Sequence, residues 1–97
     1  MQWGNNAMKF LVLWQLRSGV RGGLPEVAKM LTGLRGYAKE LHQEGKLERY
    51  YHVIGKHGGV WIFDVESNEE LEILIAKMPV YNFAEYTIHP LSEMKAV

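Results

Sequence analysis

A short segment, residues 61–71, sets the strongest constraint on the fold, because it takes the chain from a buried strand directly into a capped helix. Residues 60–65 are mostly aromatic and β-branched, as strands are. Ser67 is typical of a helix N-cap, since its hydroxyl can accept a hydrogen bond from a backbone N–H of the first turn. Glu70 can accept one from the Ser67 amide in return, which completes a capping box. The sequence therefore predicts a strand over 60–65 and a helix over about 68–78.

The rest of the chain shows the hydrophobic periodicities of four further elements. We expect a strand over 9–16, a helix that starts near Pro25 and stops just before Gly45, a strand over 47–54 joined to the next strand by a hairpin connection over 55–59, and a last strand over 83–89 closed by Pro90. This order is that of the ferredoxin-like βαββαβ fold, an α+β class with one four-stranded antiparallel sheet. Gly33 and Gly36 lie inside the first helix, where we expect them to allow close packing on the sheet.

Length and composition indicate one domain over 8–97, preceded by a polar extension over 1–7. Eleven basic and eleven acidic residues cancel, which gives no bulk attraction to nucleic acid or to a membrane surface. There is no cysteine, which fits a reducing cytoplasm. No apolar run approaches the roughly 18 residues that span a bilayer. These features predict a cytoplasmic protein with no nucleic-acid or membrane partner.

The first and third predicted strands are apolar on both faces, although helices of this fold cover only one face of the sheet. Leu11 and Leu13 alternate with other apolar residues on the first strand, and Val60 and Ile62 do so on the third. A small domain often gains missing burial by oligomerising. We therefore expect a second copy to cover the free face, which gives a homodimer of the dimeric α/β-barrel type or a larger homo-oligomer.

Several kinds of chemistry find little support in the sequence. No two histidines have the helical spacing of a zinc motif, so no metal site is predicted. Ser67 is explained as a cap, and no nucleophile elbow surrounds another serine. Trp61 and Phe63 occupy the strand that carries stacking aromatics in RNA-recognition domains, but Asp64 and Glu66 follow them in place of basic residues.

Proton transfer and anion binding remain as the best-supported chemistry. His52 is a candidate catalytic base, since histidine exchanges protons near neutral pH. Basic side chains nearby could hold a carboxylate or stabilise an enolate. The candidate substrate-binding residues are Arg35, Tyr37, Arg49, Lys56, His57 and Trp61. Each also has a structural interpretation: a half-buried strand histidine, exposed hairpin residues, a solvated arginine, a tyrosine at the edge of the core and a core tryptophan.

Five motifs resemble the muconolactone Δ-isomerases, and the resemblance runs from about residue 37 to residue 91. The most specific motif combines the end of the predicted third strand with the helix cap that follows it. The motifs are Glu44-Gly-Lys-Leu47, Val53-Ile-Gly-Lys56, Phe63-Asp-Val-Glu-Ser-Asn-Glu-Glu-Leu71, Met78-Pro79 and Ile88-His-Pro-Leu91.

The resemblance implies a cofactor-free isomerase that moves a proton along a small butenolide acid in the β-ketoadipate branch of aromatic catabolism. It implies His52 as the base, with Arg49, Arg35 or Lys56 holding the anion. Two positions depart from the family pattern: Leu34 stands in place of an acidic residue, and His52 in place of an arginine. The alternatives are a non-catalytic small-molecule-binding or interaction subunit of the same barrel type, and a cofactor-free oxygenase or dehalogenase on the same fold.

Overall fold

The computed structural model describes residues 8–19 and 24–94. The polar extension expected over 1–7 lies outside these residues. The elements are β1 (Met8–Leu16), α1 (Leu24–Gln43), β2 (Leu47–His52), β3 (Gly58–Val65), α2 (Asn68–Ala76), the 3-10 turn η1 (Tyr81–Phe83) and β4 (Ala84–Leu91).

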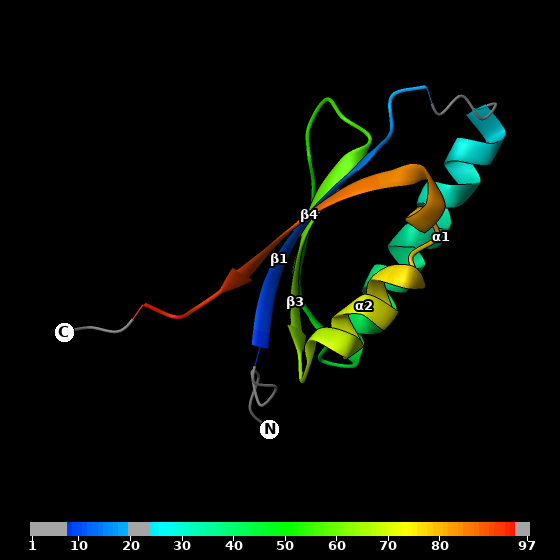
Figure 1. Ribbon diagram of the computed structural model, residues 1–97. Coiled ribbons are helices and arrows are strands. Elements are labelled where there is room, and N and C mark those ends of the chain that lie inside the picture. Colours follow the sequence, from blue (N-terminus) through cyan, green and yellow to red (C-terminus); the bar gives the residue numbers. More distant parts are fainter. Residues whose placement is uncertain (1–7, 20–23, 95–97) are drawn as a thin grey trace.

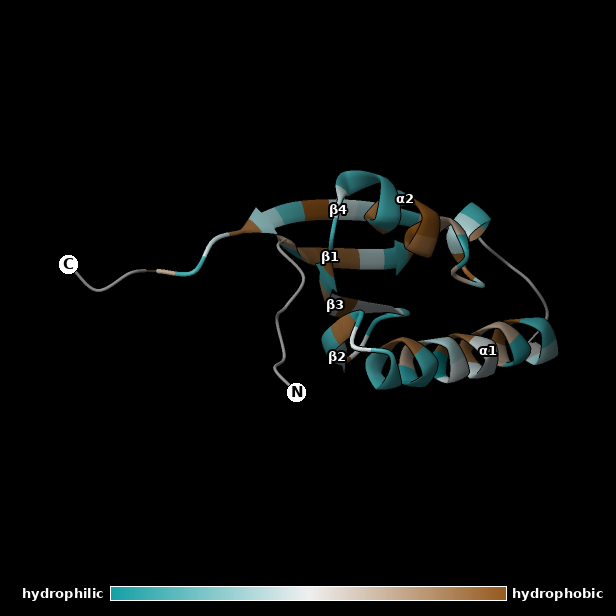
Figure 2. Cartoon of the chain, turned by 90° about the horizontal axis from the view of Figure 1, so that it is seen from below, coloured by the Kyte–Doolittle hydropathy of each residue, from teal (hydrophilic) through white to brown (hydrophobic). Residues whose placement is uncertain are grey.

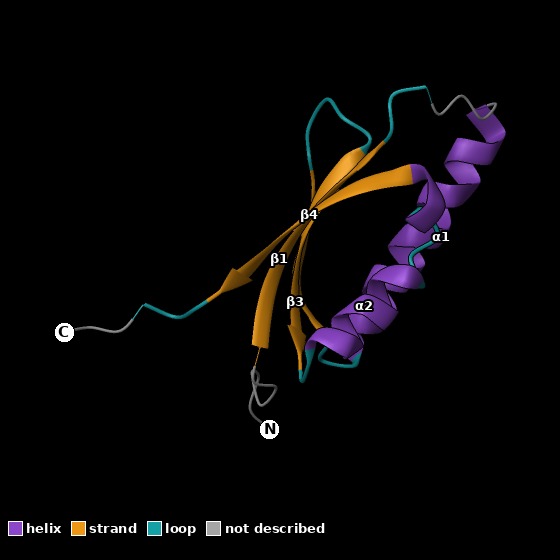
Figure 3. Ribbon diagram, in the orientation of Figure 1, coloured by secondary structure: helices purple, strands orange, loops and turns teal. Residues whose placement is uncertain are grey.

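The four strands form one antiparallel sheet in the order β2-β3-β1-β4, which can be followed across Figure 2. Both helices lie on the same side of the sheet (Figures 1 and 3). The element order and the sheet confirm the predicted ferredoxin-like α+β fold. Along α1, hydrophilic and hydrophobic residues alternate, as a helix with one buried face requires (Figure 2).

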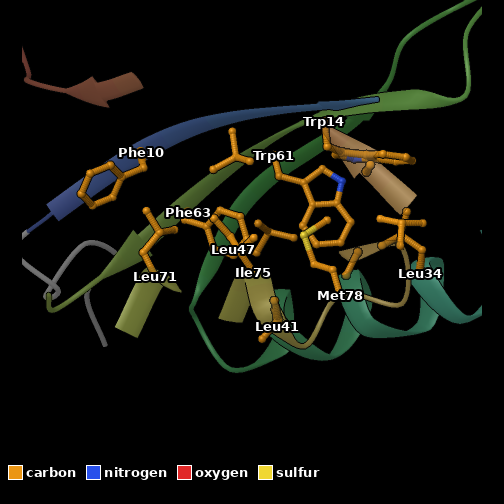
Figure 4. Packing of buried hydrophobic residues seen from close by; sticks show 14 of the residues in the cluster. Phe10, Trp14, Leu34, Leu41, Leu47, Trp61, Phe63, Leu71, Ile75 and Met78 are labelled. Carbon is orange, nitrogen blue, oxygen red and sulfur yellow. The ribbon is translucent and has the colours of Figure 1, made fainter. Parts of the chain in front are cut away.

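The core lies between the inner face of the sheet and the two helices. Phe10, Val12 and Trp14 alternate along β1 toward the helices, and each is at most 5% exposed. Trp61 and Phe63 stand opposite Val12 and Phe10 on β3, so the four side chains share one face. Leucines and other apolar residues from the helices close the core from below (Figure 4).

Gly45 terminates helix α1 just past its last residue, as the sequence predicts. The Lys46 amide donates to the Leu41 carbonyl at 2.9 Å, and the Gly45 amide donates to the His42 carbonyl at 3.1 Å. This is the Schellman pairing, which requires a left-handed residue at the position of Gly45. Gly45 has a φ of +78°, which a glycine adopts without steric cost.

The cap of α2 is confirmed in one of its two predicted bonds. The Glu70 amide donates to the Ser67 hydroxyl at 3.0 Å, so Ser67 is the N-cap. The Glu70 carboxylate, however, accepts from the Glu66 amide at 2.7 Å and not from the Ser67 amide. Its other oxygen pairs with Lys46 at 2.6 Å. The carboxylate is held between these two donors, and both lower the pKa of Glu70.

The connection between β2 and β3 lies two residues earlier than predicted, over residues 53–57. β2 ends at His52, two residues early, because residues 53–56 form a turn in which the Lys56 amide donates to the Val53 carbonyl. β3 begins at Gly58, so Gly58 and Gly59 belong to the strand and pair with Gln15 and Trp14 of β1. A Cβ on Gly58 would lie 2.5 Å from the Trp14 carbonyl oxygen. Close approach of the strands at this point therefore requires glycine.

Two further expectations need correction. Pro90 does not close the last strand, which runs on to Leu91 with Pro90 opposite Phe10. β4 is an edge strand, where a residue without an N–H is tolerated. Gly33 and Gly36 do not bring α1 close to the sheet, since both are exposed. A Cβ on Gly33 would meet the Pro79 ring in an ordinary contact, and one on Gly36 would meet nothing within 4 Å.

An irregularity in β2 decides which of its side chains face the core. Leu47 pairs with Phe63 and Arg49 pairs with Ile62, which leaves Glu48 as one extra residue. The bulge places Leu47 in the core and Arg49 on the outer face, although simple alternation would put both on one face. Beyond the bulge, Tyr50 and His52 face inward.

Neither helix of the described ranges is long and apolar enough to cross a membrane.

Candidate functional site

A cavity of about 170 Å³ opens between α1 and the inner face of the sheet. It is smaller than the pockets of about 300 Å³ or more that hold drug-sized ligands, so it suits a small molecule. The lining residues come from four elements: Leu31, Leu34, Arg35 and Ala38 of α1, Tyr50, Tyr51 and His52 of β2, Trp14 of β1 and Gly58 of β3. The α1 residues follow the 3–4 spacing of one helical face.

One row of residues across the sheet organises the end of this cavity. His52 stands opposite Gly59, and Gly59 stands opposite Trp14. Gly59 carries no side chain, so the Trp14 ring occupies the space that a larger residue there would fill. In Figure 4, Trp14 and Leu34 lie together at one end of the core.

The rim of the cavity carries its polar groups. Arg35 and His52 are exposed in part of their surface and line the cavity, whereas Leu34, Ala38 and Trp14 are buried. Arg35 forms no ion pair with any residue in the described ranges. Its guanidinium is therefore free to pair with a ligand carboxylate. The arrangement offers one cation and one proton-accepting ring beside apolar walls.

Tyr50 is held in the cavity wall by a contact from the end of α1. The His42 ring packs edge-on against the Tyr50 ring, with the ring centres 5.7 Å apart. His42 donates through Nδ1 to the Leu47 carbonyl at 2.8 Å, since the carbonyl can only accept. His42 thus ties the last turn of α1 to the first residue of β2.

The structure brings together only two of the seven predicted site residues at the cavity, Arg35 and His52. Tyr37 and Trp61 lie deeper, with their ring centres 6.3 Å apart, and neither lines the cavity. The Tyr37 hydroxyl donates to the Leu74 carbonyl of α2 at 2.6 Å. Burial, with smaller effects from Glu40 and Glu44, raises the pKa of Tyr37 to about 12.

The other three predicted residues lie away from the cavity. Arg49 stands opposite Ile62 on the outer face of the sheet, behind the bulge. Lys56 and His57 are exposed in the hairpin between β2 and β3. The backbone carbonyl of His57 accepts from the Leu16 amide at 2.9 Å, which anchors the hairpin to β1.

The sequence analysis missed Trp14 and the three apolar lining residues of α1, Leu31, Leu34 and Ala38. A signal for Trp14 was present: two adjacent glycines, Gly58 and Gly59, stand in an otherwise apolar strand and leave room for a large neighbour. A Cβ on Gly59 would lie 2.8 Å from the Trp14 Nε1 atom. This signal can be interpreted only once the β1–β3 register is known.

Among the described residues, no three histidine, aspartate or glutamate side chains are grouped so that they could hold a metal ion.

The sheet, the two helices and the small cavity define the class of protein: a ferredoxin-like α+β domain with a small, mostly apolar pocket beneath its first helix. A family model described as muconolactone delta-isomerase matches residues 8–96. The chain therefore belongs to the muconolactone Δ-isomerase family.

Relatives with curated descriptions match about three fifths of the chain. It is 34% identical over 59 residues to a muconolactone Δ-isomerase of Cupriavidus pinatubonensis, which covers 61% of this chain and 64% of that protein. It is 33% identical over 58 residues to a muconolactone Δ-isomerase of Acinetobacter baylyi, which covers 60% of each. The chain thus spans about three fifths of the length of these relatives.

Two solved structures share the fold. A muconolactone isomerase superposes with a TM-score of 0.81 at 19% identity, over 93% of this chain and 94% of that one. A 5-chloro-2-hydroxyhydroquinone dehydrochlorinase of Burkholderia phenoliruptrix, in complex with 2,5-dihydroxybenzoquinone, superposes with a TM-score of 0.71 at 16% identity, over 90% and 96%. These matches concern the fold alone.

Proposed function

We propose that this protein is a cofactor-free isomerase that shifts a proton within a small butenolide acid, and that the cavity beneath α1 is its active site. One observation carries the proposal: His52 and Arg35 line the same small cavity, and apolar side chains form most of its remaining wall. Membership of the muconolactone Δ-isomerase family supports the reaction class.

His52 acts as the base in this proposal. Its imidazole takes a proton from the ring carbon that bears the carboxylate side chain, which the ring double bond conjugates to the lactone carbonyl. The electron pair of that C–H bond forms a new carbon–carbon double bond, and the negative charge passes to the carbonyl oxygen of the dienolate. The imidazolium then returns the proton to the ring carbon next to the carbonyl. No atom is gained or lost, so one histidine that accepts and returns a proton is sufficient.

Arg35 holds the carboxylate of the substrate. It lies on α1, across the cavity from β2, and an arginine binds a carboxylate through two parallel N–H donors. The pairing fixes the ring relative to His52. Arg49, Lys56 and His57 receive no direct role at this cavity, because the first stands on the outer face of the sheet and the other two in the exposed hairpin.

The test measures turnover of muconolactone by ultraviolet absorbance with matched pairs of variants. We expect the wild type to turn over the lactone, and His52→Ala to lower kcat by about a hundredfold or more. His57→Ala is the control, because it removes the same ring from the exposed hairpin five residues away. Arg35→Ala should raise KM by about tenfold, the loss of one charged hydrogen bond. Lys39→Ala, one turn further along α1 and outside the cavity, should leave KM unchanged.

Two results would count against the proposal. Turnover by folded His52→Ala at the wild-type rate would remove His52 from the chemistry. A wild-type protein that binds the lactone in calorimetry without converting it would favour the non-catalytic binding subunit. Circular dichroism of each variant separates a lost side chain from a lost fold.

A further inference from the structure

Trp14 carries a buried hydrogen-bond donor that nothing in the described ranges satisfies. The side chain is 4% exposed and lines the cavity. Its Nε1 atom is buried and has no hydrogen-bond partner among the described residues. Buried indole N–H groups usually find an acceptor, and an unsatisfied one calls for an explanation. Because the Trp14 side chain lines the cavity, a ligand bound there is the natural source of the missing acceptor.

The register of the sheet indicates which way this donor is turned. Of the indole atoms, Nε1 comes nearest to the place where a Cβ of Gly59 would be, at 2.8 Å, and Cε2 follows at 3.3 Å. Gly59 lies between Trp14 and His52 in the row across the sheet. The N–H edge of the ring therefore lies over Gly59 of β3, on the side of β1 that faces β3 and β2.

We infer that the Trp14 indole N–H donates a hydrogen bond to the carbonyl oxygen of a small cyclic ester or ketone bound in this cavity. Tyr50 and the apolar face of α1 provide a wall for a flat ring, and Arg35 at the rim provides a cation for a carboxylate. Trp14 would then recognise the carbonyl end of the ligand. A single donor in an apolar wall also orients the ring, because a ligand bound the other way round would leave both its oxygen and the indole unpaired.

The inference rests on the proposed function in one respect, the step at which the donor acts. When His52 removes the proton, the charge that develops on the carbonyl oxygen strengthens the bond from the indole N–H. A donor that is already in place at a charge-developing oxygen accelerates the step. Trp14 would thus be a catalytic residue that touches the substrate, and the binding inference stands without the reaction.

Binding is tested on the wild-type protein by NMR of its isotopically labelled indole N–H groups. The chain has three tryptophans, and the spectrum of Trp14→Phe assigns the Trp14 signal by its absence. We expect an unsubstituted butenolide to move the Trp14 indole proton downfield. Cyclopentene, a ring of similar size with no hydrogen-bond acceptor, should leave it in place. A Trp14 signal that stays unmoved at saturating butenolide overturns the inference.

Kinetics separate this role from a packing role. Trp14→Phe keeps an aromatic ring in the cavity wall and should lower kcat toward muconolactone by at least tenfold, with a smaller change in KM. Trp61→Phe is the matched control, because Trp61 is equally buried but does not line the cavity, so it should lose stability and keep kcat. Unchanged kcat in folded Trp14→Phe overturns the catalytic role.

The two proposals fail in different ways. If butenolide shifts the Trp14 signal and muconolactone is not turned over, the isomerase proposal fails and the binding inference is supported. If the wild type turns over muconolactone and the Trp14 signal does not respond to butenolide, the isomerase proposal stands and the inference is overturned.

Discussion

At the scale of single residues, the role of a polar side chain depends more on what it contacts than on its residue type. Tyr37 and His52 both qualified as site candidates from the sequence. In the structure the Tyr37 hydroxyl donates to the Leu74 carbonyl, 37 residues away, whereas His52 lines the cavity. No local pattern encodes a contact between α1 and α2 of this kind, because it depends on how the two helices pack on the sheet.

Tyr37 gives a prediction about stability at alkaline pH. Burial raises its pKa from 10.0 to about 12, so the folded state holds the phenol proton more tightly than the unfolded state. The stability from this group is complete below pH 10 and is lost as the pH rises toward about 12. In urea unfolding, Tyr37→Phe should cost about 1 kcal/mol at neutral pH through the lost hydrogen bond. It should also show a shallower loss of stability than the wild type across the alkaline range.

The control for this prediction is Tyr51→Phe, which removes a hydroxyl from an exposed ring. Burial also raises the pKa of Tyr86 to about 12, so part of the alkaline loss persists in Tyr37→Phe and should disappear only in the double phenylalanine variant. Equal slopes for the wild type and that double variant between pH 10 and pH 12 would contradict the assignment.

At the scale of elements, local signals predicted which helices and strands form, and tertiary contacts decided where they end. Ser67 and Gly45 act on backbone groups within a few residues, so the sequence identified both caps correctly. The start of β3 at Gly58 depends on the Trp14 carbonyl of another strand. The bulge at Glu48 likewise moves Arg49 to the outer face of the sheet, and no neighbouring residue in the sequence signals it. The sequence could propose His52 and Arg35 as members of one site. The cavity that both residues line depends on the register of β1, β3 and β2, which the sequence does not show.

Helix α1 offers a test of what its interior glycines contribute. Gly36 lies inside α1 and is exposed, and a Cβ added there would meet no atom within 4 Å. Gly36→Ala should therefore raise the free energy of unfolding by about 1 kcal/mol, because alanine loses less conformational freedom on folding. Gly45→Ala is the opposite control: the residue has a φ of +78°, and alanine there should cost about 1 kcal/mol. Denaturant unfolding of the two variants measures both changes, and a destabilised Gly36→Ala would indicate that this face of α1 is covered in solution.

At the scale of the whole molecule, the sheet has one face beneath the helices and one face that residues 8–19 and 24–94 leave uncovered. Leu11, Leu13, Val60 and Ile62 stand on the outer face, in two neighbouring strands. At one end of this face Lys9 pairs with Glu48 at 2.6 Å. An apolar centre bordered by ion pairs is the composition of a protein interface. The sequence predicted the apolar outer face from the two-sided strands, and the paired register confirms that these residues lie side by side.

We predict that a second copy covers this outer face. The wild type should sediment as a dimer or larger oligomer at micromolar concentration, because apolar sheet surface leaves water on association. Leu13 is 40% exposed in the isolated chain and lies at the centre of the face. Leu13→Glu would bury an unpaired carboxylate in the contact and should shift the protein to monomers. Ile54→Glu is the matched control, since Ile54 is 94% exposed in the hairpin and a charge there should leave the assembly intact. Monomers of the wild type at this concentration, or an oligomer that survives Leu13→Glu, would show that the outer face is not the contact surface.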